Sequence, residues 1–262
     1  MPYEAQIEGK NVKENETSTA DLLRKVPHLA PVMQQIEKAE FSQEMSRLSV
    51  LIVHMYEDPL STSAALNRVI MYTLYNCICK THDTKLGFLI LFNRGILAPA
   101  FLLSRSIFEL WAAACFVEKT IVDFRTQRNE AKLVKIANKL FAGARYPAEL
   151  PWGEPSTEKP VHINEMLAEL EQRHPGAGDT YGFLCEYCHP NFLYNTEAYL
   201  ASHQEALWEN VRFRDSLAAA LERQLSSLCQ SLCGIKASAR AVSDMCLDEY
   251  GVVYPGDRQS GA

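Results

Sequence analysis

The chain has 262 residues, of which 47% are hydrophobic and 22% are charged, and its formal net charge at pH 7 is −6. This composition is normal for a globular chain that buries a full core, and the acidic balance argues against a protein that coats nucleic acid with its whole surface. The N-terminal residues are polar and show no apolar signal segment, so we expect a cytoplasmic protein. The eight cysteines are then expected to be reduced thiols.

The apolar spacing is helical along almost the whole chain. The sequence pattern predicts a disordered leader at residues 1–17 and a single helical domain at residues 18–249. It predicts a flexible tail at residues 250–262. A proline-rich loop is expected at 143–160. We expect helices at 20–41, 42–56, 61–80, 85–118, 121–142, 161–173, 179–188 and 202–241. No strand-type alternation is present, so the predicted fold class is all-α, a multi-helix bundle with a long C-terminal helix.

The most apolar segment, 86–117, carries three charges. Its uncharged stretch between Arg94 and Arg105 is far shorter than the ~20 residues of a membrane span, so we expect a buried helix, kinked at Pro99, and no membrane. On one continuous helix, Arg94, Arg105 and Glu109 would share a face. Two compatible interpretations are a structural Arg105–Glu109 ion pair, and a polar pocket in which Arg105 holds an anion and Glu109 orients the arginine or a neighbouring histidine.

Residues 184–191, LCEYCHPN, match several metal and haem patterns. Cys-x-x-Cys-His occurs in c-type haem proteins, but nothing here marks a distal ligand. Zinc would need two more ligands, and a di-iron bundle would need a second Glu-x-x-His motif. We therefore expect no metal and no cofactor, two core-packed cysteines at 185 and 188, and His189 at the helix end, facing Arg105 and Glu109.

Arg-Ser-Ile-Phe-Glu at 105–109 and the later Tyr181…His189-Pro-Asn191 resemble motifs of a group of uncharacterised bacterial helical proteins. These are similar in outline to the HEPN superfamily, helical bundles of toxin–antitoxin and antiviral systems, many of which are metal-independent ribonucleases. The resemblance covers about residues 60–240 and implies that Arg105, Glu109, Tyr181 and His189 form one interior cluster. In a ribonuclease, His189 would move protons at a ribose 2′-OH and Arg105 would stabilise charge on phosphate. HEPN ribonucleases carry an arginine shortly before this histidine, where the present chain has Gly-Phe-Leu at 182–184.

A basic stripe is a second candidate site. Its members step by three and four along the expected helix 121–142, and they are Arg125, Arg128, Lys132, Lys135 and Lys139. A phosphate backbone could lie along this row, although a solvated helix face is the plainer interpretation.

Three hypotheses about function follow from these patterns. The first is a HEPN-like protein, catalytic or degenerate, that acts on or binds RNA or a nucleotide in bacterial defence or a toxin–antitoxin system. The second is a non-enzymatic interaction module, a homodimer through helix 202–241, whose leucine stripe at 217–235 supports it. The third is a metal or small-ligand binder that uses Glu109, Glu186 and His189. The catalytic candidates are Arg105, Glu109 and His189, and the binding candidates are Tyr181, Glu186, Asn191, Arg94, Arg125, Arg128 and Lys132.

Overall fold

The structure is a computed structural model that describes residues 23–57, 62–141, 159–188 and 211–250. In these ranges all regular elements are helical. They are the 3-10 helix η1 (Pro27–Leu29) and the α-helices α2 (Ala30–Lys38), α3 (Ser42–Glu57), α4 (Thr62–Asn93), α5 (Leu97–Gln127), α6 (Glu130–Phe141), α7 (Ile163–Arg173), α8 (Ala177–Glu186) and α10 (Val211–Tyr250). The predicted all-α bundle with a long C-terminal helix is confirmed. The predicted leader and nearly all of the predicted loop and tail lie outside the described residues.

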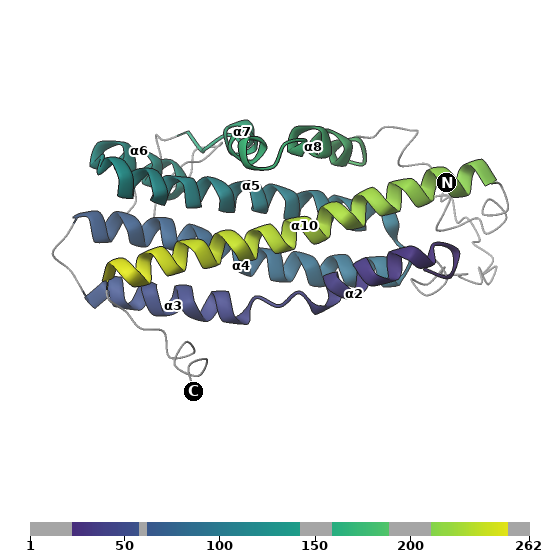
Figure 1. The fold of residues 1–262 in the computed structure, drawn as a ribbon, viewed down its shortest axis with the longest axis horizontal. Coiled ribbons are helices and arrows are strands. Elements are labelled where there is room, and N and C mark those ends of the chain that lie inside the picture. The colour runs from purple at the N-terminus through teal and green to yellow at the C-terminus, as the bar shows by residue number, and fades with distance from the viewer. Residues whose placement is uncertain (1–22, 58–61, 142–158, 189–210, 251–262) are drawn as a thin grey trace, which may run out of the picture.

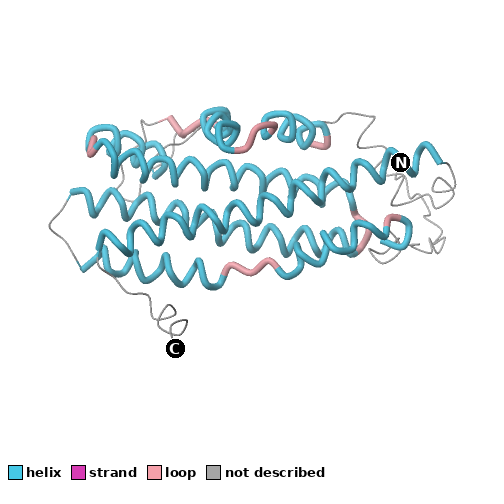
Figure 2. The backbone as a smooth tube through the Cα atoms, viewed as in Figure 1, coloured by secondary structure: helices cyan, strands magenta, loops and turns pink. Residues whose placement is uncertain are grey.

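The bundle is elongated, and its long helices run side by side along the long axis (Figure 1). Helix α5 is central: it packs against α4 and α10, and its outer side is covered by the short helices α7 and α8. Helix α3 packs against α4 and α10, and α2 packs against α10 at the other end of the bundle. Figure 2 shows how short the described loops between these helices are. The core therefore forms around α5, which carries Arg105 and Glu109.

The break between α4 and α5 falls at Arg94 and Gly95. Gly95 has a φ of 72°, in the left-handed region where glycine carries no steric penalty, and the N–H of Ile96 turns back to donate to the carbonyl of Leu91 at 2.9 Å. Pro99 lies in the first turn of α5, where its missing N–H leaves no helix bond unmade. The expected kink at Pro99 and the expected shared face are therefore wrong, and Arg94 is exposed in the turn.

A second break separates α5 from α6, where sequence analysis predicted one helix. Arg128 caps α5 with a φ of 50°, and its N–H donates to the carbonyl of Phe124 at 2.8 Å. Asn129 then starts α6, because its side-chain oxygen accepts from the N–H of Lys132 at 3.0 Å. The expected basic stripe is consequently divided between two helices, and its interpretation as one continuous row is wrong.

The leucine stripe of α10 lies inside the bundle of its own chain. Its members are at most 1% exposed, and they are Leu217, Leu221, Leu225, Leu228, Leu232 and Ile235. The predicted apolar face is thus confirmed for residues 217–235, while 202–210 lie outside the described residues. Because the stripe fills the chain's own core, it no longer supports a homodimer, which stays a prediction without this argument.

By length and composition, α5 could cross a membrane, since its most apolar 18-residue window has a mean hydropathy of 1.5. Of that window, 56% is buried inside the bundle. The core helix of a bundle meets the same criterion, so the hydropathy of α5 does not show whether the chain crosses a membrane.

Candidate functional site

The structure brings Arg105, Glu109 and Tyr181 together in one hydrogen-bonded cluster between α5 and α8. The Nη2 of Arg105 lies 2.9 Å from Oε1 of Glu109, one helical turn further along α5. The same Nη2 donates to the hydroxyl of Tyr181 at 3.0 Å, and this hydroxyl donates to Oε1 of Glu109 at 2.9 Å. The three groups form a ring of contacts, and Tyr181 is more than 70 residues away from Arg105 and Glu109 in the sequence. We call Arg105, Glu109 and Tyr181 the cluster.

Helix α8 is held by hydrogen bonds at its start and by packing along its length, and these contacts position Tyr181. At its start, the carboxylate of Glu171 accepts from the N–H groups of Gly176 and Gly178 at 2.8 and 2.7 Å. Gly176 has a φ of 91°, a conformation that other residues adopt only with strain. Along the helix, the Tyr181 ring stacks on Phe108 with centroids 6.2 Å apart, and Leu184 is fully buried. The tyrosine hydroxyl is therefore directed at α5 by packing as well as by its hydrogen bonds.

Burial and mutual contacts stabilise the charged form of Arg105 and the neutral form of Tyr181. The side chains of Arg105 and Glu109 are 30% and 35% exposed. Partial burial opposes the charge of Arg105, but hydrogen bonds to Cys188 and Tyr181 and the nearby Glu109 carboxylate outweigh it and raise its pKa. Burial, with a further contribution from Glu109, raises the pKa of Tyr181 to about 12. Near neutral pH the cluster thus presents a permanent cation and a protonated phenol.

The two cysteines of the LCEYCHPN segment lie beside the cluster. Both are half-buried, where sequence analysis expected them in the core. The thiol of Cys188 donates to the carbonyl of Leu184 at 3.4 Å, and burial raises the pKa of Cys185 in spite of the nearby Arg105. Within the described ranges, no group of three or more His, Cys, Asp or Glu side chains is arranged to hold a metal ion.

The remaining residues of this segment are placed only in part. Glu186 is the last residue of α8 and is half-buried. His189 and Asn191 lie outside the described residues, so the expected place of His189 beside Arg105 and Glu109 and the binding role of Asn191 stay predictions. The described chain reaches Cys188, one residue before the histidine, and Cys188 contacts Arg105.

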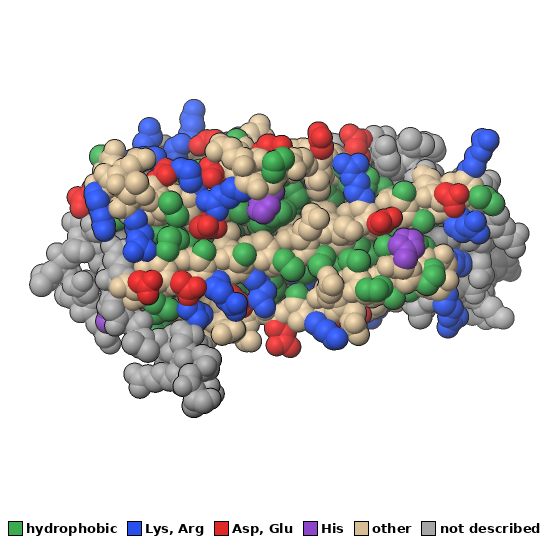
Figure 3. All heavy atoms as spheres, in the orientation of Figure 1, with side chains coloured by type: hydrophobic (Ala, Val, Ile, Leu, Met, Phe, Trp, Pro, Cys, Tyr) green, Lys and Arg blue, Asp and Glu red, His purple; other side chains and the backbone are tan. Residues whose placement is uncertain are grey.

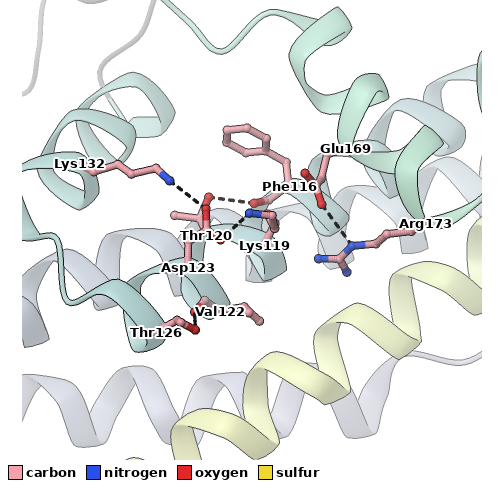
Figure 4. A network of polar contacts seen from close by, with 9 residues as sticks. All are labelled: Phe116, Lys119, Thr120, Val122, Asp123, Thr126, Lys132, Glu169 and Arg173. Carbon is pink, nitrogen blue, oxygen red and sulfur yellow. Dashed lines mark hydrogen bonds and ion pairs between the residues drawn. The ribbon is translucent and has the colours of Figure 1, made fainter.

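The basic candidates on α5 and α6 contact neighbouring groups that sequence analysis did not identify. Arg125 donates from Nη1 to the carbonyl of Met245 at 2.9 Å and so ties α5 to the end of α10. Lys132 lies 2.9 Å from Asp123, which also binds Lys119, and these hydrogen bonds lower the pKa of Asp123 (Figure 4). On the face drawn in Figure 3, basic and acidic side chains are interspersed. Structural contacts thus occupy part of this stripe, and phosphate binding along it stays a prediction.

Glu109 also borders a feature that sequence analysis missed. A surface groove of about 400 Å³ lies where α4, α5 and the start of α7 meet, and Lys80 is among its lining residues. No sequence pattern marks Lys80, because the groove depends on how three helices pack together.

Comparison with known proteins does not assign the site. No family model, no curated protein and no solved structure matches the chain. The interpretation of the cluster therefore rests on its geometry and on the motifs of the sequence.

Proposed function

We propose that this chain is a HEPN-like helical protein whose cluster binds a phosphate group of RNA or of a nucleotide, in bacterial defence or a toxin–antitoxin system. The observation that carries the proposal is the ring of contacts between Arg105, Glu109 and Tyr181. These contacts join the two segments on which the resemblance rests, although the segments are far apart in the sequence.

The geometry of the arginine supports anion binding. A guanidinium group has five N–H donors, and the contacts to Glu109 and Tyr181 both use Nη2. With Cys188 as a further partner, donors are still left for an oxyanion. Its Nε is buried and has no hydrogen-bond partner in the described part of the chain. An oxyanion bound at this guanidinium would satisfy this donor.

Glu109 and Tyr181 have a positioning role in this proposal. They hold the guanidinium in one orientation before the ligand arrives, which reduces the entropy lost on binding. The Tyr181 hydroxyl stays protonated because its pKa is raised to about 12, so it keeps the hydrogen bond to Glu109 across the physiological pH range.

Catalysis is a further part of the proposal and depends on His189. As the resemblance implies, a metal-independent ribonuclease would use His189 to move the proton of a ribose 2′-OH and Arg105 to stabilise charge on the phosphate. The contact between Arg105 and Cys188, the residue before His189, supports this assignment.

Binding is tested with a fluorescein-labelled single-stranded RNA, whose anisotropy is measured at low salt. Hydrogen bonds to charged groups are worth ~1.5–3 kcal/mol, so Arg105→Met should weaken binding by about tenfold or more. Arg214→Met is the matched control: it also removes one positive charge, from a side chain that is 46% exposed on α10. Equal weakening by both variants would show that only net charge matters, and would contradict the proposal.

Catalysis is tested by incubating the same RNA with the wild-type protein and with His189→Ala, followed by gel analysis. RNA loss that disappears in His189→Ala supports a ribonuclease. If the wild type leaves the RNA intact but binds it in a way that depends on Arg105, the protein binds RNA without cleaving it. RNA loss that persists in His189→Ala argues against His189 as the catalytic group.

A further inference from the structure

The groove beside Glu109 owes its shape to small side chains. Helices α4 and α5 are in close contact at Gly87, where an added Cβ would lie 3.1 Å from Cδ1 of Leu103. The next pair toward the groove, Thr84 and Ser106, has short side chains that line the opening instead of filling it. The start of α7 forms the third wall and is fixed by a capping box at His162, whose Nδ1 accepts from the N–H of Asn164 at 3.2 Å. The opening is thus part of the packed fold.

The groove has an apolar wall and two polar groups, Lys80 and Glu109, that can still form an ion pair or a hydrogen bond with a ligand. Leu110, Ile163 and Met166 supply apolar surface from α5 and α7. Lys80 is exposed on α4, and no ion pair to it occurs within the described ranges. The carboxylate of Glu109 uses Oε1 for both of its contacts in the cluster, and no contact to its Oε2 occurs among the described residues.

Charge decides which ligand suits this arrangement. Arg105 neutralises Glu109 at 2.9 Å, so the ammonium of Lys80 is the uncompensated charge of the groove. The groove volume of about 400 Å³ is in the range of small-molecule sites, roughly 300–1,000 Å³. An anionic group at Lys80, an apolar body against α7 and a hydrogen-bond donor at Glu109 would complement all three features.

We propose that the groove binds a small organic anion. Its acidic group pairs with Lys80, its apolar body packs against Leu110, Ile163 and Met166, and an N–H or O–H group donates to Oε2 of Glu109. This site goes beyond the phosphate site at Arg105 and does not depend on it, although the two share Glu109.

The test uses two dyes that differ in one group. 8-Anilinonaphthalene-1-sulfonate (ANS) has a sulfonate, an apolar ring system and one N–H, and N-phenyl-1-naphthylamine has the same rings and N–H without the sulfonate. Both are titrated with protein while fluorescence is followed. An exposed ion pair is worth ~0.2–1 kcal/mol, so Lys80→Met should weaken the binding of ANS up to about fivefold and leave the neutral dye unchanged. Lys38→Met, at an exposed position on α2, is the matched control and should change neither dye.

The apolar wall is tested separately with Met166→Glu, which should weaken both dyes by about tenfold or more because it places a carboxylate in the apolar contact. Circular dichroism checks that this variant folds, and Lys80→Met, at an exposed position, keeps the test valid if it does not. The inference is overturned if Lys80→Met leaves the affinity for ANS unchanged, or if a folded Met166→Glu does. It is also overturned if Lys80→Met weakens the neutral dye as much as ANS. Neither result bears on RNA binding by Arg105, so the two proposals fail separately.

Discussion

The crossing of α5 and α10 depends on a glycine, and Gly234→Ala should show this. A Cβ added at Gly234 would lie 2.8 Å from Cδ1 of Trp111 and still closer to Nε1 and Cε2 of the same ring. The indole has little room to move, because it packs against Phe108 at 5.5 Å and against His174 at 4.8 Å between ring centroids, and is only 5% exposed.

The expected magnitude follows from two opposing effects. Overpacking a core costs ~1–3 kcal/mol, and a clash with three atoms of a rigid ring belongs in the upper part of that range. Alanine is favoured over glycine inside a helix by roughly 0.5–1 kcal/mol, which offsets part of the cost. We expect a net loss of about 2 kcal/mol in the free energy of unfolding.

Urea unfolding followed by far-UV circular dichroism measures this loss. Gly182→Ala on α8 is the matched control, because a Cβ there would meet nothing within 4 Å, and it should be neutral or slightly stabilising. The double variant Gly234→Ala/Trp111→Phe should recover part of the loss, because the smaller ring leaves room for the methyl group. A Gly234→Ala protein as stable as the wild type would refute the close packing of α5 on α10.

Three further predictions concern single side chains. The pKa of Tyr181 is raised to about 12 from 10, so the unfolded chain ionises first and folding stability falls between these pH values. Urea unfolding should show a smaller alkaline loss in Tyr181→Phe, and an equal loss would contradict the raised pKa. Lys85→Met removes a buried donor to two backbone carbonyls at the end of α2 and should cost about 1–3 kcal/mol, against a negligible change for exposed Lys135→Met in the same urea assay. Exposed Cys233 should react rapidly with a thiol reagent, and Cys77, whose burial raises its pKa to about 11, should react only on unfolding; similar rates by peptide mass spectrometry would contradict this.

Sequence periodicity predicts the parts of this fold in which local pattern and burial agree. The face of α10 from Leu217 to Ile235 is one such part, because steps of three and four place its apolar residues on one stripe and the bundle buries that stripe. The break at Arg128 could not be predicted in this way. Here an arginine adopts the left-handed backbone conformation, so neither glycine nor proline marks the turn in the sequence. At Arg94, glycine follows directly, but the apolar pattern continues on both sides and conceals the turn.

In the candidate site too, only the contacts between residues close in sequence could be predicted. The Arg105–Glu109 pair follows from helix geometry, because residues four apart lie on one face. The contribution of Tyr181 depends on how α8 packs on α5, and only the resemblance between motifs indicated it. Lys80 was beyond sequence reasoning, because its relation to Glu109 exists only through the packing of α4 and α7 on α5.

The carboxylate of Glu171 has a consequence for the lifetime of the cluster. Helix α8 has 10 residues, too few to be stable alone in water, so its order depends on packing and on the two N–H groups that Glu171 holds. Those hydrogen bonds lower the pKa of Glu171, so the stability they give is present at neutral pH and is lost as the pH falls through that lowered pKa. We therefore expect α8 to open locally without unfolding of the bundle, and native-state hydrogen exchange would detect this opening at the amides of Gly176 and Gly178. Arg105 would remain on an intact α5 during each opening, without the tyrosine that orients it.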